Sequence, residues 1–294
     1  MPALAASNPQ IRRLRRLLGR RSARSADGAM VFEGPTLVAE AIATGAGVES
    51  VFVDDDHIDD DGILDLAGRA GVEVQRVAPG VLGSISDVVT PRPVLAIVAI
   101  PLARLDEVVA RSRSQARHLV VLVEVRDPGN VGTIIRAAEA SGAAGVICTT
   151  GTVDPWSPKV ARSSSGAVLH LPVVTGVEAA DAVAELGDAA VPTLGTVLAD
   201  APAFDQVDLS GTVALFLGNE AHGLDPALSG SLHGAITIPM EGRTESLNVA
   251  MAASILCFEA LAQRRRGVYH STSEPGPEES DWTAAEGDDK VIGR

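Results

Sequence analysis

Short, continuously apolar segments alternate with helical or loop-like segments in the second half of the chain. The apolar segments are HLVVLVEV, AGVICTT, VPTLGTVL, TVALFLG and AITIPM. Stretches of helical periodicity, or loops rich in Gly, Pro and Asp, separate them. Buried strands that alternate with helices are typical of a mostly parallel sheet covered on both faces. The pattern therefore predicts an α/β domain over residues 119–268.

A smaller α/β domain is predicted over residues 29–104. Its predicted strands are MVFEG, VESVFVD, VEVQRVA and VLAIVAI, and its predicted helices are TLVAEAIATG and ILDLAGRAG. A polar helical segment over residues 105–118 is expected to link the two domains. The run DDDHIDDD, from Asp54 to Asp61, lacks the glycine turn and the glutamate of a calcium loop, so we expect a solvated loop. Residues 269–294 hold seven acidic and two basic residues, which predicts a disordered acidic tail.

The first 28 residues are predicted to form a basic helix. Apolar residues repeat at helical spacing within residues 9–24, and arginines fill the positions between them. An arginine face of this kind either contacts solvent or binds phosphate groups, and RNA binding is the functional hypothesis. The arginines concerned are Arg12, Arg13, Arg15, Arg16, Arg20 and Arg21.

Composition narrows the functional classes. The 294 residues are 46% hydrophobic but only 3% aromatic, so the core must be aliphatic, and the length fits two domains. The formal net charge of −14 argues by itself against a nucleic-acid partner, yet residues 1–26 carry seven Arg and no acidic residue. That excess of arginine is equally consistent with a genomic bias. The sequence has no run of about 18 apolar residues and no secretory signal, so we expect a cytoplasmic protein without a membrane partner.

Other classes are excluded by what the chain lacks. Its two cysteines, Cys148 and Cys257, cannot form a disulfide framework, and their apolar surroundings predict burial. No set of Cys, His and carboxylate residues has metal-ligand spacing, so we expect no metal. Motifs of the types GxGxxG, GxxxxGK[ST] and GxSxG do not occur where dinucleotides, phosphate loops or nucleophile elbows require them.

Polar residues that could carry chemistry follow the first strand of the larger domain. Asp127 and Asn130 are suited to a loop and a helix cap, and Arg136 lies further along the following helix. Because Ile134 and Ile135 precede Arg136, its guanidinium would need an acceptor to offset desolvation. Spacing alone does not distinguish a phosphate from a carboxylate in that role.

Two later strands end in similar polar loops. The strand TVALFLG runs into Gly218 and Glu220, where a parallel sheet binds ligands and where glycine would let a ligand approach the backbone. His222 in the same loop is interpreted as an ordinary loop residue. The strand AITIPM leads to Ser246, a suitable helix N-cap, and to Asn248, a poor helix former just inside the next helix.

The larger domain holds three motifs: Asn130-x-Gly132-x-x-x-Arg136, Leu217-Gly218-Asn219-Glu220-x-x-Gly223-Leu224, and Ile238-Pro239-Met240 with Ser246-Leu247-Asn248-Val249. Together they resemble the motifs of SpoU/TrmH-type RNA 2′-O-ribose methyltransferases, members of the SPOUT superfamily. The match covers residues 119–265 and includes the middle segment KVARSSSGAVLHLPV. Through NPQIRRLRRLLGRR and VFEGPTLVAEAI, the N-terminal half resembles the substrate-binding domain of ribosomal-RNA and thiostrepton-resistance methyltransferases.

The resemblance implies a fold, a cofactor and site residues. The fold is a parallel α/β sheet with a deep C-terminal trefoil knot, and the chain is expected to form a homodimer. S-adenosyl-L-methionine is the implied methyl donor, and the residues that match the donor-binding positions are Gly218, Ile238 and Leu247, with Thr196 added from the loop after VPTLGT. The implied catalytic residues are Arg136, Asn130, Glu220, Ser246 and Asn248.

The implied function is 2′-O-methylation of ribosomal RNA, of the 23S type, with S-adenosyl-L-methionine as donor. Alternatives are a tRNA 2′-O-methyltransferase and a non-catalytic RNA-binding member of the fold. The long segment before the larger domain favours rRNA, and the complete polar set argues against binding alone. We expect Arg136 to hold the phosphate beside the target ribose, because a free arginine is a poor base. Proton transfer to Arg136 itself is the alternative.

Overall fold

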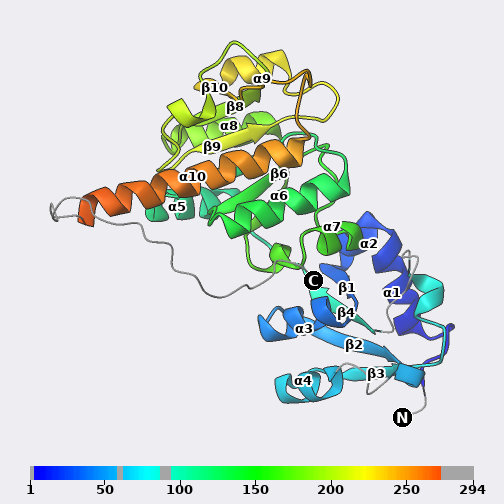
Figure 1. The fold of residues 1–294 in the computed structure, drawn as a ribbon. Helices are drawn as coiled ribbons and strands as arrows, with labels where there is room; N and C mark the ends of the chain where they lie inside the picture. Colours follow the sequence, from blue (N-terminus) through cyan, green and yellow to red (C-terminus); the bar gives the residue numbers. More distant parts are fainter. Residues whose placement is uncertain (1–2, 58–61, 87–93, 273–294) are drawn as a thin grey trace.

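Two sheets divide the chain into two domains (Figure 1). The structure is a computed structural model, and it describes residues 3–57, 62–86 and 94–272. The smaller, N-terminal domain is a four-stranded sheet in the order β1-β4-β2-β3, in which β4 is antiparallel to both β1 and β2. Its elements are α1 (Pro9–Gly19), α2 (Arg21–Asp27), β1 (Ala29–Glu33), α3 (Pro35–Ala43), β2 (Val48–Asp54), α4 (Ile63–Ala70), β3 (Val74–Val77) and β4 (Val94–Ala99).

The predicted basic helix over residues 9–24 is two helices. The chain is extended at Arg20, with φ −131° and ψ 118°, and α2 begins at the next residue. The break lets the side chain of Arg24 fold back, so that its Nη1 donates to the carbonyl oxygen of Leu17 at 2.6 Å. A continuous helix was therefore the wrong prediction, because the last carbonyls of α1 find their donor in a buried side chain.

The larger domain is a six-stranded, wholly parallel sheet in the order β10-β8-β9-β5-β6-β7. Together with the smaller domain before it, this architecture confirms the predicted fold class, while the trefoil knot stays a prediction. Its elements are α5 (Leu105–Gln115), β5 (Leu119–Leu122), α6 (Pro128–Ala140), β6 (Gly145–Thr149), α7 (Pro158–Ser163), β7 (Val173–Val177), α8 (Ala179–Asp188), β8 (Thr193–Val197), β9 (Ala214–Leu217), α9 (Pro226–Ser231), β10 (Gly234–Thr237) and α10 (Val249–Thr272).

Helices cover both faces of this sheet, as its continuously apolar strands predict. Alternate residues of β5 point to opposite faces: Val120 packs with α6 and α10, and Val121 packs with α5 and α8. The cysteines are buried as predicted, and burial raises the pKa of both the Cys148 and the Cys257 thiols to about 12. One apolar cluster continues from the N-terminal sheet through α7 to the larger sheet, so the two domains share packed core.

Some local predictions differ from the structure. Strand β7 at the sheet edge is not among the predicted strands, because its five residues include Gly176 and alternate weakly. Strand β10 ends at Thr237, before Pro239, which has no N–H group for a ladder. Asp54 at the end of β2 is buried and its Oδ2 accepts from the Gly80 N–H at 3.0 Å, so this end of the acidic run is not solvated. Residues 58–61 of that run lie outside the described residues.

The prediction that a disordered tail begins at residue 269 is wrong. Helix α10 extends to Thr272, so the backbone of residues 269–272 is helical. Residues 273–294 lie outside the described residues.

Candidate functional site

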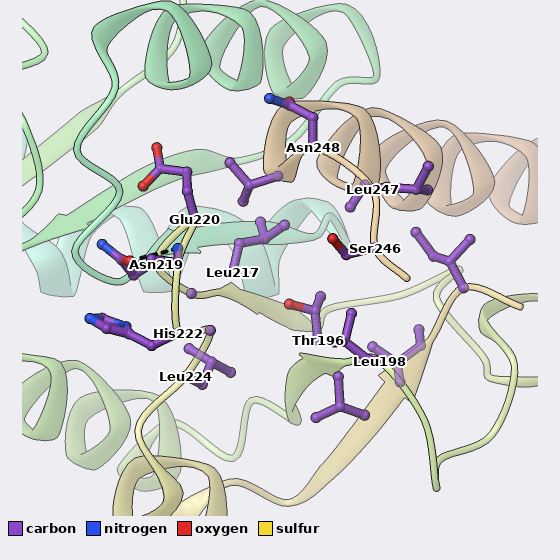
Figure 2. A pocket seen from close by; sticks show the side chains of 18 of the residues that line it. Thr196, Leu198, Leu217, Asn219, Glu220, His222, Leu224, Ser246, Leu247 and Asn248 are labelled. Carbon is purple, nitrogen blue, oxygen red and sulfur yellow. Dashed lines mark hydrogen bonds between the residues drawn. The ribbon is translucent and has the colours of Figure 1, made fainter. Parts of the chain in front are cut away.

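A pocket of about 720 Å³ opens at the carboxyl end of the larger sheet, beside the loop that follows β9 and the start of α10 (Figure 2). This is the edge at which a parallel sheet binds ligands. All four residues predicted to bind the methyl donor line the pocket, and so do three of the predicted catalytic residues. They are Thr196, Gly218, Ile238 and Leu247 in the first group, and Glu220, Ser246 and Asn248 in the second.

A chain of hydrogen bonds joins three polar side chains beside the pocket. The Asn130 Nδ2 donates to Glu220 Oε1 at 3.0 Å, and the Asn248 Nδ2 donates to Asn130 Oδ1 at 3.0 Å. Three elements that are far apart in the sequence, α6, the loop after β9 and α10, thus meet at Asn130. Its carboxamide is held at both ends, which fixes its orientation.

Helix capping places two of these side chains. Asp127 caps α6, and its Oδ1 accepts from the Asn130 N–H at 2.9 Å. Asn248 immediately precedes α10, and its Oδ1 accepts from the Ala250 N–H at 2.8 Å. The prediction that Asn248 lies inside the helix and that Ser246 caps it is therefore wrong, because the helix begins later, at Val249.

Glu220 is held as an anion at the edge of the pocket. Its Oε1 accepts from the backbone N–H of Asp127 at 3.1 Å, and its Oε2 accepts from that of Arg126 at 3.2 Å. Burial acts to raise the pKa of Glu220, but the hydrogen bonds from Asn130 and from these backbone groups outweigh it and hold the pKa below its ordinary value. The carboxylate therefore ties the loop after β9 to the start of α6.

Gly218 is required by the loop itself. A Cβ atom built there would lie 2.2 Å from the carbonyl carbon of Gly223, which is backbone and cannot rotate away. Asn219 and Gly223 exchange two backbone hydrogen bonds of 3.0 and 2.9 Å across this loop. From the sequence we expected glycine here because a ligand approaches the backbone. In the structure, the backbone of Gly223 already fills the space that a Cβ atom would need.

Asn219 belongs to the second motif, but the sequence assigned it no role, and in the structure it holds the loop together. It is buried, and its Nδ2 donates to the carbonyl oxygen of Glu124 at 2.9 Å, while its Oδ1 accepts from the Ala221 N–H at 2.9 Å. A polar residue two positions after the end of a buried strand was the available signal. His222, which we interpreted as a loop residue, lines the pocket (Figure 2).

Arg136 does not line the pocket. It lies six residues after Asn130, about 9 Å along the helix axis, and its side chain is exposed, so the expected desolvation does not occur. Its Nη1 donates to Ser165 Oγ at 2.9 Å, and no carboxylate of the described residues pairs with it. The guanidinium therefore keeps donors directed at solvent, next to the site.

The predicted RNA-binding arginines differ in their contacts. Arg13 is half-buried and pairs with Asp27 at 3.0 Å and with Glu49 at 2.6 Å. The other predicted positions are exposed and have no ion pair among the described residues; they are Arg12, Arg15, Arg16, Arg20 and Arg21. We refer to these five as the arginine ridge.

The described ranges contain neither a membrane span nor a metal site. No helix there is long and apolar enough to cross a membrane. No group of three or more His, Cys, Asp and Glu side chains there is arranged to hold a metal ion.

Sequence comparison assigns both halves of the chain. Residues 117–258 match the SpoU rRNA Methylase family, and residues 8–96 match the MRM3-like substrate binding domain. Over 236 residues the chain is 31% identical to the 23S rRNA (guanosine(2553)-2′-O)-methyltransferase RlmP of Bacillus subtilis, covering 80% of this chain and 89% of RlmP. The chain belongs to the SpoU rRNA methylase family.

Solved structures of this family share the fold. An AdoMet-bound rRNA methyltransferase from Sinorhizobium meliloti has a TM-score of 0.77 and 29% identity, covering 90% of this chain and 98% of that protein. The SpoU methyltransferase AviRb from Streptomyces viridochromogenes, in complex with AdoMet, has a TM-score of 0.79 and 29% identity, covering 88% and 98%. The family and the RNA methyltransferase class are as predicted, and S-adenosyl-L-methionine is the cofactor of this SpoU methylase.

Proposed function

We propose that this SpoU methylase transfers a methyl group from S-adenosyl-L-methionine to a ribose 2′-hydroxyl of ribosomal RNA, of the 23S type. The observation that carries the proposal is the hydrogen-bonded set of Asn130, Glu220 and Asn248, two of which line the pocket. The name of RlmP and the match to a substrate-binding domain support the rRNA assignment. Such a substrate would place the enzyme in the cytoplasm.

The pocket fits the donor in size and in chemistry. Its volume of about 720 Å³ lies within the range of small-molecule sites, roughly 300–1,000 Å³. Leu217, Ile238 and Leu247 supply apolar surface for a nucleoside, and Thr196 and Ser246 supply hydroxyl groups. When bound, the donor supplies an electrophilic methyl group on a positively charged sulfur.

The chain's own residues would align the ribose and stabilise charge. The 2′-hydroxyl must face the methyl carbon in line with its bond to sulfur, and the fixed carboxamide of Asn130 is placed to orient it. The solvent-directed guanidinium of Arg136 would bind the phosphate next to the target ribose and offset the negative charge that develops on the oxygen. An arginine side chain is a poor base, so Arg136 would act as a charge and not as a proton acceptor.

The arginine ridge would bind RNA phosphates. Charge reversal of Arg15 and Arg16 should weaken RNA binding and flatten its dependence on salt, because a protein that makes fewer phosphate contacts releases fewer counterions when it binds. An unchanged salt dependence would show that the arginine ridge faces solvent and does not bind RNA.

A second copy of this chain is the expected partner in solution. Met251 and Phe258 of α10 are 59% and 49% exposed and lie seven residues apart, on one face of the helix. An exposed apolar stripe of this kind marks an interaction surface. A homodimer that packs these stripes together would place two pockets near one interface.

The test is methyl transfer from labelled S-adenosyl-L-methionine to total bacterial RNA, followed by mapping of the labelled ribose. We expect label in 23S rRNA, in the 2′-O position. Label in tRNA would refute the substrate, and no label with intact donor binding would favour an RNA-binding protein without activity. Arg136→Ala should abolish transfer and leave the donor Kd nearly unchanged, and normal turnover in that variant would refute the role of Arg136.

A further inference from the structure

Arg24 is a buried cation that joins the two domains. Its side chain is 6% exposed, and its Nη2 lies 2.6 Å from Asp154 Oδ2, while its Nε donates to the same oxygen at 2.7 Å. The Nη1 donates to the carbonyl oxygens of Leu17 at 2.6 Å and Leu18 at 3.2 Å, at the end of α1. One guanidinium thus binds α1, belongs to α2, and pairs with a carboxylate of the larger domain.

The partner of Arg24 lies in a loop that reaches the active site. Asp154 belongs to the loop after β6, and its Oδ1 accepts from the Trp156 N–H at 3.1 Å. In the same loop, the Val153 N–H donates to the carbonyl oxygen of Val125 at 3.0 Å. The next two backbone N–H groups after Val125, those of Arg126 and Asp127, bind the carboxylate of Glu220. Hydrogen bonds therefore link the end of α1 to the catalytic polar set, joined by the backbone steps from Asp154 to Val153 and from Val125 to Arg126.

We propose that Arg24 is a positioning residue: through Asp154 it holds the arginine ridge of α1 and α2 in a fixed register with the methyl-donor pocket. The inference rests on the proposed function, since the ridge must bind the RNA whose ribose is methylated. Arg20 and Arg21 lie four and three positions before Arg24, so the contact of Arg24 with Asp154 fixes the position of these two cations. The ion pair joins α2 to the loop that precedes α7.

Other contacts hold the domains together without Arg24. Arg162 of α7 pairs with Glu33 of β1 at 3.2 Å, and the shared apolar cluster continues across the junction. Loss of Arg24 should therefore leave the domains attached but loosen α2, while Leu17 and Leu18 keep the end of α1 packed in the N-terminal core. The expected defect is in the alignment of bound RNA and not in its capture.

The experiment compares Arg24→Met with the wild-type full chain. Methionine keeps an unbranched stem and removes every donor. We measure the donor Kd by calorimetry, the Kd for a 23S rRNA fragment that the wild type methylates, and the single-turnover rate of methyl transfer. We expect a rate at least tenfold lower, with the donor Kd changed less than twofold and the RNA Kd less than threefold. Arg76→Met, which removes the ion pair of Arg76 with Asp55 within the N-terminal domain, is the matched control and should keep the wild-type rate.

A second variant guards against misfolding. Asp154→Asn keeps the shape of the side chain, removes its charge, and should give a rate between those of the wild type and of Arg24→Met. A folded Arg24→Met variant with the wild-type rate would overturn the positioning role, even if its Tm is lower, and would leave the proposed function intact. A wild-type chain that methylates no RNA would refute the proposed function, and the positioning role with it.

Discussion

Substitution of Gly218 tests whether the close packing of the loop after β9 creates the donor pocket. In Gly218→Ala, the new Cβ atom would lie 2.2 Å from the carbonyl carbon of Gly223 and 2.4 Å from the nitrogen of Leu224. Both are backbone atoms, so the loop must open. Opening breaks the two hydrogen bonds between Asn219 and Gly223 and moves Glu220 away from Asn130.

The size of the effect follows from these contacts. Overpacking costs about 1–3 kcal/mol, and two backbone hydrogen bonds contribute about 1–3 kcal/mol together. The sum corresponds to a Tm lowered by roughly 10 °C for a domain of this size. Because Gly218 and Glu220 both line the pocket, the donor Kd should rise about tenfold or more, which corresponds to ~1.4 kcal/mol.

The assay is thermal unfolding together with calorimetric titration of the donor. Gly187→Ala is the matched control, because Gly187 lies in α8 with no atom within 4 Å of the added Cβ and should keep or slightly raise the Tm. A Gly218→Ala variant with the Tm and the donor Kd of the wild type would refute the reasoning, since it would show that the loop tolerates the Cβ atom.

Three further predictions concern pH, charge and assembly. Burial, reinforced by the charges of Arg264 and Arg117, lowers the pKa of His118 from 6.5 to about 3. The unfolded chain therefore binds this proton first, and stability should fall as pH drops below 6.5, by roughly 3 kcal/mol at pH 4; His118→Gln should flatten that part of a Tm-against-pH profile. Glu220→Gln should lower the rate of methyl transfer roughly 10- to 100-fold. Because the pKa of Glu220 is lowered from 4.5, its carboxylate stabilises the fold above pH 4.5, and this contribution is lost as the pH falls further; the Glu220→Gln variant should lack it at every pH. The double variant Met251→Asp, Phe258→Asp should be a monomer in sedimentation velocity, and an unchanged dimer would exclude this face of α10 as the interface. The control is Leu102→Asp, because Leu102 is 90% exposed and lies outside α10.

The local pattern of apolar residues was sufficient to predict those strands and loops whose structure depends on a short segment of the chain. The apolar segments VESVFVD and TVALFLG contain strands β2 and β9, whose buried side chains belong to the hydrophobic clusters of the two domains. The motif residues Gly218, Ile238 and Leu247 were placed at one pocket because loops that follow parallel strands meet at the same edge of a sheet. Pattern was insufficient for the edge strand β7, which pairs on one side only and shows little alternation.

Side-chain roles that depend on distant partners were predicted less well. The apolar neighbours of Arg136 suggested a desolvated guanidinium, but they lie on other sides of α6 and leave Arg136 exposed. Arg24 belongs to the same basic segment as the arginine ridge, yet it is buried because Asp154 and the end of α1 surround it. Nothing within residues 9–24 distinguishes Arg24 from its neighbours.

By itself, the sequence determined the family, the donor and most of the elements, and it predicts the residues that carry the chemistry. These follow from short motifs and from periodicity, which are local properties of the chain. Only the tertiary structure decided which of those residues touch one another. Asn130 binds Glu220 and Asn248, which are 90 and 118 residues away, because the parallel topology brings α6, the loop after β9 and α10 to one edge. Contacts between elements so far apart depend on how whole layers pack, and no local pattern encodes that packing.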